Sequence, residues 1–200
     1  MRFVYGSPPS VPDFQPFEEG WTALREPSPL LLNLIATPLG FGLAILAALG
    51  WGITDVQLQF SGTSPFAPLY FLGWVLAGFA ALVLVHEMIH AFGYPRFGFT
   101  ADTLIGVWPS KMLFYAVYLG ELPRNRWLLV YLLPLLVITV LPLAICRAFG
   151  LNQPIVAAFS IANALFAGGD VTCFLLIIAQ VPATARMCNQ GWSTFWKLSA

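Results

Sequence analysis

Charged residues are scarce in this chain of 200 residues. Only 9% of them are Asp, Glu, Lys or Arg, whereas 58% are hydrophobic. Soluble domains carry about 25% charged residues, and a water-soluble fold of this length has too much surface for so few charges to cover. We therefore expect the lipid bilayer to be the solvent for much of the chain. The formal net charge is zero, so no basic field indicates binding to nucleic acid.

Cysteine and signal-peptide features are also lacking. The 3 cysteines, Cys146, Cys173 and Cys188, are far apart and odd in number. They predict neither a disulfide framework nor a CxxC metal site, and we interpret them as packing residues. Residues 1–29 lack the continuous apolar core of a signal peptide. The first long apolar run is therefore expected to remain as a membrane span.

Long apolar runs dominate the rest of the chain. Runs long enough to cross about 30 Å of hydrocarbon as helices occupy residues 30–51, 67–92, 127–146 and 154–180. We predict an all-α, multi-pass membrane protein with about four transmembrane helices in a core of residues 30–181. Lys and Arg outside these runs place the N-terminal segment (1–29) and the tail (182–200) in the cytoplasm. The compactness of the chain suggests a prokaryotic plasma membrane.

The segment between the second and third runs has a different composition. Residues 103–108 and 112–118 are rich in β-branched and aromatic side chains, and Pro109-Ser110-Lys111 separates them. This pattern predicts a small β-hairpin or a re-entrant element close to the membrane surface. The alternative is an interfacial segment that only shields the helices.

The only two histidines lie four residues apart, in the motif His86-Glu87-Met88-Ile89-His90 at the end of the second apolar run. On a helix, positions i and i+4 share a face, so both imidazoles can reach one ion. Glu87 is turned about 100° away and lies beside that ion. This is the HExxH arrangement, in which two histidines bind zinc and the glutamate polarises a water. We therefore predict Zn²⁺ as the cofactor and Glu87 as the general base and acid.

Ionisable groups inside an apolar helix cost a few kcal/mol each, so these three need a partner. A zinc ion would use all of them, and a hydrogen-bonded cluster without metal is the alternative. A catalytic zinc site needs a third protein ligand, and Asp170 is the only other acid inside an apolar run. Cys173, one turn further on, is the weaker competitor. The other interpretation of Asp170 is a carboxylic acid that stays protonated or is capped by Thr172.

Asn163 lies seven residues before Asp170, on a similar face of the same predicted helix. A buried amide in lipid needs a partner. It could donate a hydrogen bond to a substrate carbonyl or to the developing oxyanion. An interhelical hydrogen bond without a catalytic role is the alternative.

The motif His86–His90, followed by Ala91-Phe92-Gly93, together with Asn163 and Gly168-Gly169-Asp170, resembles a family of membrane zincin peptidases. It is also similar to the site-2 protease type of intramembrane zinc metalloproteases. In those proteins an Asn–Pro element leads to an Asp-Gly. Asn163 and Asp170 match this pattern, whereas the proline and the following glycine do not, because Val171 follows the aspartate. The resemblance covers about residues 20–185 and implies a zinc peptidase without a known substrate.

The sequence therefore favours a zinc-dependent peptidase that acts within the membrane or at its boundary on a membrane protein or a peptide. His86, His90 and Asp170 are the expected ligands. One alternative is a membrane protein that binds or senses zinc without hydrolysis. The other is an inactive scaffold that binds membrane partners through its helices.

Overall fold

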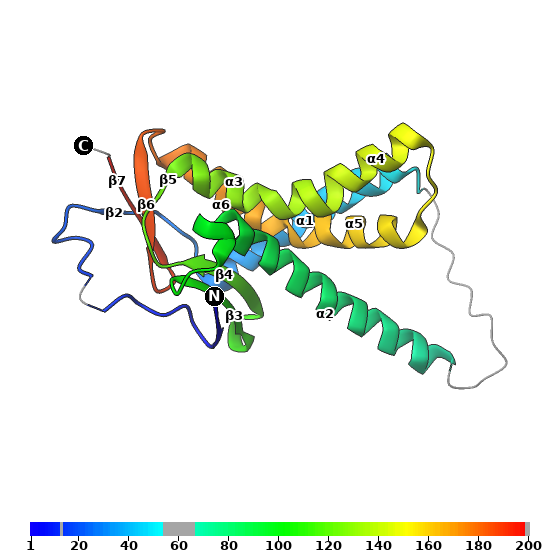
Figure 1. Cartoon of the computed structure of the whole chain (residues 1–200), viewed down its shortest axis with the longest axis horizontal. Coiled ribbons are helices and arrows are strands. Elements are labelled where there is room, and N and C mark those ends of the chain that lie inside the picture. Colours follow the sequence, from blue (N-terminus) through cyan, green and yellow to red (C-terminus); the bar gives the residue numbers. More distant parts are fainter. Residues whose placement is uncertain (13, 54–66, 199–200) are drawn as a thin grey trace.

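The computed structural model describes residues 1–12, 14–53 and 67–198. Its helices extend to one side of the molecule, whereas the strands gather toward the other end (Figure 1). The longer helical elements are α1 (Pro29–Trp51), α2 (Ala67–Gly93), α3 (Arg124–Pro134), the π-helix η3 (Leu135–Val140), α4 (Leu141–Phe149), α5 (Pro154–Phe166) and α6 (Gly168–Gln180). Two short 3-10 helices, η1 (Pro95–Gly98) and η2 (Pro109–Lys111), lie between α2 and α3.

The predicted spans are found as helices, with one difference. Helices α1, α2 and the continuous helical stretch Arg124–Phe149 are each long and apolar enough to cross a membrane. The predicted run of residues 154–180 is divided into α5 and α6, which are bent by 44° relative to each other. The bend comes where Gly168-Gly169 follows Ala167, and glycine weakens a helix interior. The described residues thus hold three such helices, or four if the bent pair is one span.

The strands form two small sheets. One has the order β1-β3-β4, with β1 (Arg2–Tyr5) parallel to β3 (Thr103–Trp108) and β3 antiparallel to β4 (Leu113–Tyr118). The other has the order β2-β7-β6-β5 and is antiparallel throughout. Its strands are β2 (Thr22–Ala23), β5 (Leu122–Pro123), β6 (Ala185–Gln190) and β7 (Ser193–Leu198).

The hairpin predicted between the second and third runs is confirmed by β3 and β4, which η2 connects. The all-α prediction was wrong for the two ends of the chain, because β1 and β2 come from the N-terminal segment and β6 and β7 from the tail. Strands β1 and β2 pair with residues far away in the sequence, because Arg2 pairs with Leu104 and Thr22 with Trp196. Strands β6 and β7 pair with each other, but residues 185–190 contain no β-branched or aromatic side chain that would predict a strand.

Helix α1 packs closely against α5 and α6. A Cβ atom at Gly168 would collide with the backbone of α1 at Ala36 and Gly40, and one at Gly40 would collide with the carbonyl of Leu165. Only glycine permits backbones to approach so closely. This contact lies at Gly168, the first residue of α6, and Asp170 lies two residues further along the helix.

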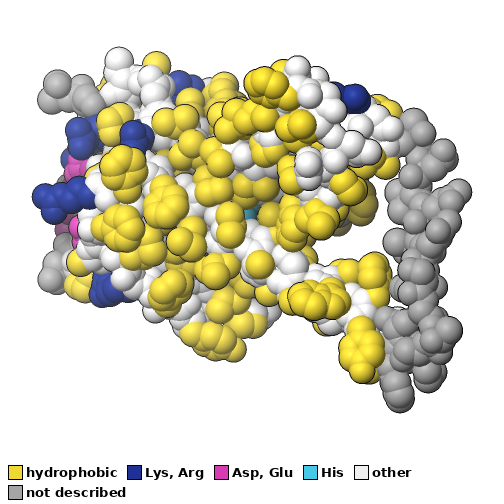
Figure 2. Space-filling model, turned by 45° about the vertical axis from the view of Figure 1, so that its right-hand side comes forward, with side chains coloured by type: hydrophobic (Ala, Val, Ile, Leu, Met, Phe, Trp, Pro, Cys, Tyr) yellow, Lys and Arg dark blue, Asp and Glu magenta, His cyan; other side chains and the backbone are white. Residues whose placement is uncertain are grey.

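The surface has an apolar part over the helices and a charged part toward the strands. Hydrophobic side chains cover most of the face of the helices seen in Figure 2, and charged side chains gather at the end where the strands lie. Large apolar side chains on α2 are well exposed, among them Leu69, Tyr70 and Trp74. A monomer in water rarely exposes so continuous an apolar surface, which agrees with helices that are apolar enough to span a membrane.

Candidate metal centre

The motif residues occupy the last two turns of α2, where this helix meets the rest of the molecule. His86, Glu87 and His90 are all buried, although most of the preceding turns of α2 are exposed. Helix α2 packs against α3 and β4 at this end. The polar groups of the motif are therefore enclosed by protein, as ionisable groups in an apolar helix must be.

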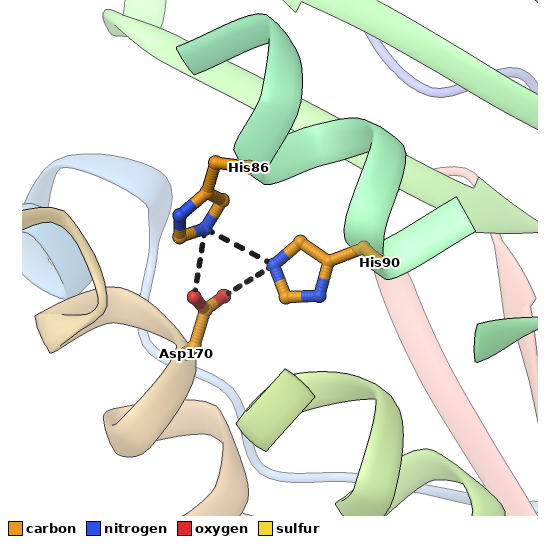
Figure 3. A group of neighbouring side chains, drawn as sticks. All are labelled: His86, His90 and Asp170. Atoms are coloured by element: carbon orange, nitrogen blue, oxygen red, sulfur yellow. Dashed lines mark hydrogen bonds and ion pairs between the residues drawn. The ribbon is translucent and has the colours of Figure 1, made fainter. Parts of the chain in front are cut away.

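Three side chains that can act as metal ligands, those of His86, His90 and Asp170, converge between α2 and α6 (Figure 3). His86 Nε2 lies 3.0 Å from Asp170 Oδ2, His90 Nε2 lies 3.1 Å from Asp170 Oδ1, and the two Nε2 atoms are 3.2 Å apart. Ligands about 2.0–2.1 Å from a tetrahedral zinc ion are separated by about 3.3 Å. The chemistry and the spacing of these donors therefore fit a zinc ion with two histidine ligands and one carboxylate ligand.

The ring of His90 is held by a backbone carbonyl in α3. Its Nδ1 lies 2.8 Å from the carbonyl oxygen of Val130. That carbonyl precedes Pro134 by four residues, and a proline has no N–H to donate to it in the usual helical bond. Pro134 therefore frees an acceptor for the Nδ1–H of His90. The tautomer that results leaves Nε2 available as a ligand, the usual arrangement around metal-binding histidines.

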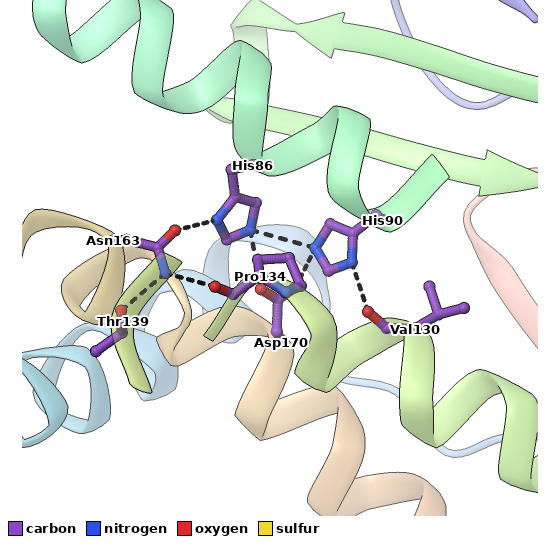
Figure 4. Close-up of polar contacts among 7 residues, drawn as sticks. All are labelled: His86, His90, Val130, Pro134, Thr139, Asn163 and Asp170. Carbon is purple, nitrogen blue, oxygen red and sulfur yellow. Dashed lines mark hydrogen bonds and ion pairs between the residues drawn. The ribbon is translucent and has the colours of Figure 1, made fainter. Parts of the chain in front are cut away.

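The ring of His86 is held in the same way by Asn163 of α5 (Figure 4). His86 Nδ1 and Asn163 Oδ1 are 2.8 Å apart. The amide nitrogen of Asn163 donates to the carbonyl of Pro134 and to the hydroxyl of Thr139, both at 3.0 Å. Asn163 is 0% exposed, and its hydrogen-bonding groups are directed to these partners. Asn163 thus makes interhelical hydrogen bonds, with His86 of the candidate metal site as one partner.

Asp170 faces both histidines from the first turn of α6. The alternative in which Thr172 caps it is not found, because the hydroxyl of Thr172 donates to the carbonyl of Gly168 at 2.7 Å. Among the described residues, His86, His90 and Asp170 form the group of His, Cys, Asp and Glu side chains that could hold a metal ion together, with one ligand atom of each within 4.8 Å of the others. Cys173, the predicted competitor, lines the same cavity but is not part of this group.

Glu87 points to strand β4 beside this group. Its carboxylate accepts a hydrogen bond from the backbone of Ala116. The carbonyl of Ala116 in turn accepts a hydrogen bond from the hydroxyl of Tyr94 at 2.9 Å. Burial raises the pKa of the Tyr94 phenol further above its usual range, so this hydroxyl remains a donor at neutral pH. The hairpin predicted from the sequence therefore forms one wall of the site.

A cavity of about 840 Å³ gives access to this cluster. It is lined by the metal-site group and Glu87, by β4, by α1 and by two regions for which the sequence predicted no role. These regions are the N-terminal segment, with Glu26 and Pro27, and the hairpin of β6 and β7, with Asn189 and Thr194. No motif marks them, and the long-range pairing of β2 with β7 helps to bring them together at the site.

The chain belongs to the family described as "Putative zincin peptidase", whose model matches residues 79–186, more than half of the chain. This agrees with the resemblance found in the sequence, and the matched part contains the motif on α2 as well as Asn163 and Asp170. Family membership indicates a zinc metallopeptidase as the class of protein and zinc as the metal. No curated protein and no solved structure matches the chain.

Proposed function

We propose that this protein is a zinc-dependent peptidase that hydrolyses peptide bonds within a membrane or at its boundary. The observation that carries the proposal is the convergence of His86, His90 and Asp170 beside Glu87, at the buried C-terminal end of the apolar helix α2. His86, His90 and Asp170 would hold the zinc ion, the first two through Nε2. Bound there, the ion would supply a Lewis acid that lowers the pKa of a water molecule to about 7.

Glu87 would move the proton in this reaction. Its carboxylate lies in the same cavity as the cluster, so it can accept a proton from the attacking water and later deliver it to the leaving amine. The hydrogen bond from Ala116 fixes its orientation toward β4. Asn163 and the carbonyl of Val130 would orient the two histidines. Mutation of such partners typically lowers metal affinity or activity 10- to 100-fold.

Strand β4 offers a place for an extended substrate. It is an edge strand of its sheet, and residues 112–117 line the cavity. The backbone N–H and C=O of Ala116 point away from β3 and bond with Glu87 and Tyr94. Backbone groups of alternate residues in a strand point to the same side, so those of Phe114 also face this open edge. A peptide that adds to this edge would be unwound, with its scissile carbonyl accessible, as helical peptide bonds are not.

The test is the variant Glu87→Gln, compared with wild type in detergent or in lipid vesicles. We expect the variant to bind zinc as wild type does and to lose cleavage of an apolar, membrane-associated reporter peptide. Glu18→Gln, which removes a carboxylate outside the cavity, should leave both properties unchanged. Cleavage by Glu87→Gln at the wild-type rate would disprove the mechanism. Zinc binding without cleavage by either protein would favour a non-hydrolytic zinc protein.

A further inference from the structure

Glu26 is a carboxylate in the cavity that the proposed mechanism does not use. It lies in the segment between β2 and α1, two residues before the N-cap Ser28. Both of its oxygens accept hydrogen bonds from Thr194 of β7, one from the backbone N–H at 2.8 Å and the other from the hydroxyl at 2.7 Å. The carboxylate is therefore held in one orientation in the wall of the cavity.

Among the described residues that line this cavity, none carries a positive side chain to compensate Glu26. The described residues that line the cavity supply three carboxylates, those of Glu26, Glu87 and Asp170. They include no Lys and no Arg. A divalent ion at the histidines would balance only two of these negative charges. Burial raises the pKa of the Glu26 carboxyl above its usual range, which agrees with the lack of a positive partner.

Glu26 also lies where the apolar and polar parts of the molecule meet. The helices supply apolar lining residues such as Phe41, Phe79 and Phe166, whereas the segment before α1 and the β6–β7 hairpin supply Glu26 and Thr194. Membrane-spanning segments carry Lys and Arg next to their apolar part on the cytoplasmic side. An apolar stretch followed by a basic residue would therefore match both parts of the lining.

We propose that Glu26 is a specificity-determining residue that binds a Lys or Arg side chain of the substrate. The proposal rests on the peptidase function given above, because it assumes that a polypeptide occupies this cavity. Glu26 lies outside residues 79–186, the part that matches the family model. The preference for a basic residue would thus be a property that the N-terminal part of this chain adds to the zinc site.

Binding of peptides tests this separately from hydrolysis. Fluorescent apolar peptides with a single Lys at successive positions, and their Gln twins, are titrated against zinc-loaded Glu87→Gln protein, which serves as an inert background. At one position the Lys peptide should bind roughly ten- to a hundredfold more tightly than its Gln twin, as expected for a hydrogen bond to a charged group. Adding Glu26→Gln should bring this ratio close to one, and adding Glu18→Gln should not change it.

Two results would overturn the proposal. One is an absence of preference for Lys at every position, and this result does not require any variant of Glu26 to fold. The other is a preference that persists in the Glu26→Gln background when zinc content and melting temperature show that the protein is folded. Neither result bears on the peptidase function, which depends on cleavage by the wild-type protein.

Discussion

Replacement of Asn163 by alanine tests the orientation of the metal-site histidines. The change removes the acceptor that lies 2.8 Å from Nδ1 of His86. The buried Nδ1–H of His86 is then left without a partner. The change also removes the amide that donates to Pro134 and Thr139. An unsatisfied buried donor costs about 1–3 kcal/mol, and loss of a histidine's outer partner weakens metal binding about 10- to 100-fold. We expect the zinc affinity of the Asn163→Ala protein to fall within that range.

The assay is competition for zinc against a chelator of known affinity, followed by peptide cleavage at increasing zinc concentration. Saturating zinc should restore most of the activity, because the orientation of His86 affects the binding of zinc more than the rate of peptide cleavage by the zinc-bound protein. Ser160→Ala is the matched control, since Ser160 is buried one turn earlier on α5 and bonds with Thr139 and Trp51 instead of His86. Unchanged zinc affinity with a loss of activity that zinc does not restore would refute the reasoning and assign Asn163 to the oxyanion.

The remaining predictions concern packing and pH. Gly168→Ala should lower the free energy of unfolding by about 1–3 kcal/mol and weaken zinc binding, because its Cβ would meet the backbone of α1; Gly169→Ala, where the space is open, should be tolerated in both measurements. For Glu26, the pKa is raised above its ordinary value of 4.5 in the folded chain, so its contribution to stability is full below that value and is lost as the pH rises through the folded pKa. The melting temperature of wild type should therefore fall more than that of Glu26→Gln between about pH 4 and about pH 8, and equal decreases would contradict the burial of an uncompensated carboxylate.

The long apolar helices and the pair of histidines could be predicted because their signals are local. Apolar runs of membrane length predict helices without knowledge of their neighbours. The spacing of His86 and His90 places both rings on one helix face. Asp170 was found by elimination, as the only other acid in an apolar run. The β-branched and aromatic residues of 103–108 and 112–118, with Pro109-Ser110-Lys111 between them, likewise indicated the β3–β4 hairpin.

The rest depends on partners that are distant in the sequence. Strands β1 and β2 have two to four residues each and pair with strands about a hundred or more positions away. A local signal did exist for β7, because Gly191, which has a positive φ of 62°, precedes the β-prone residues Thr194-Phe195-Trp196. Part of the role of Pro134 could also be inferred from the sequence, because a proline within a helix leaves the carbonyl four residues before it without its usual hydrogen bond. That this carbonyl meets His90 follows only from the packing of α2 on α3.

The same limit applies to Asn163 and Glu26. The sequence indicated that Asn163 needs a partner, but an amide can face a substrate or another helix, and only the packing of α5 places it on His86. Nothing in the sequence connects Glu26 with a motif sixty residues later. Its position depends on the pairing of β2 with β7 and on the two hydrogen bonds from Thr194.

The zinc content of the purified protein tests the central claim most directly. Wild type should retain about one zinc ion per chain, whereas His86→Ala and Asp170→Ala should retain little of it. Cys173→Ala should keep its zinc, because Cys173 is not part of the ligand group. Wild-type protein that is folded, supplied with zinc and still free of bound metal would contradict the account and favour a hydrogen-bonded cluster of the same residues.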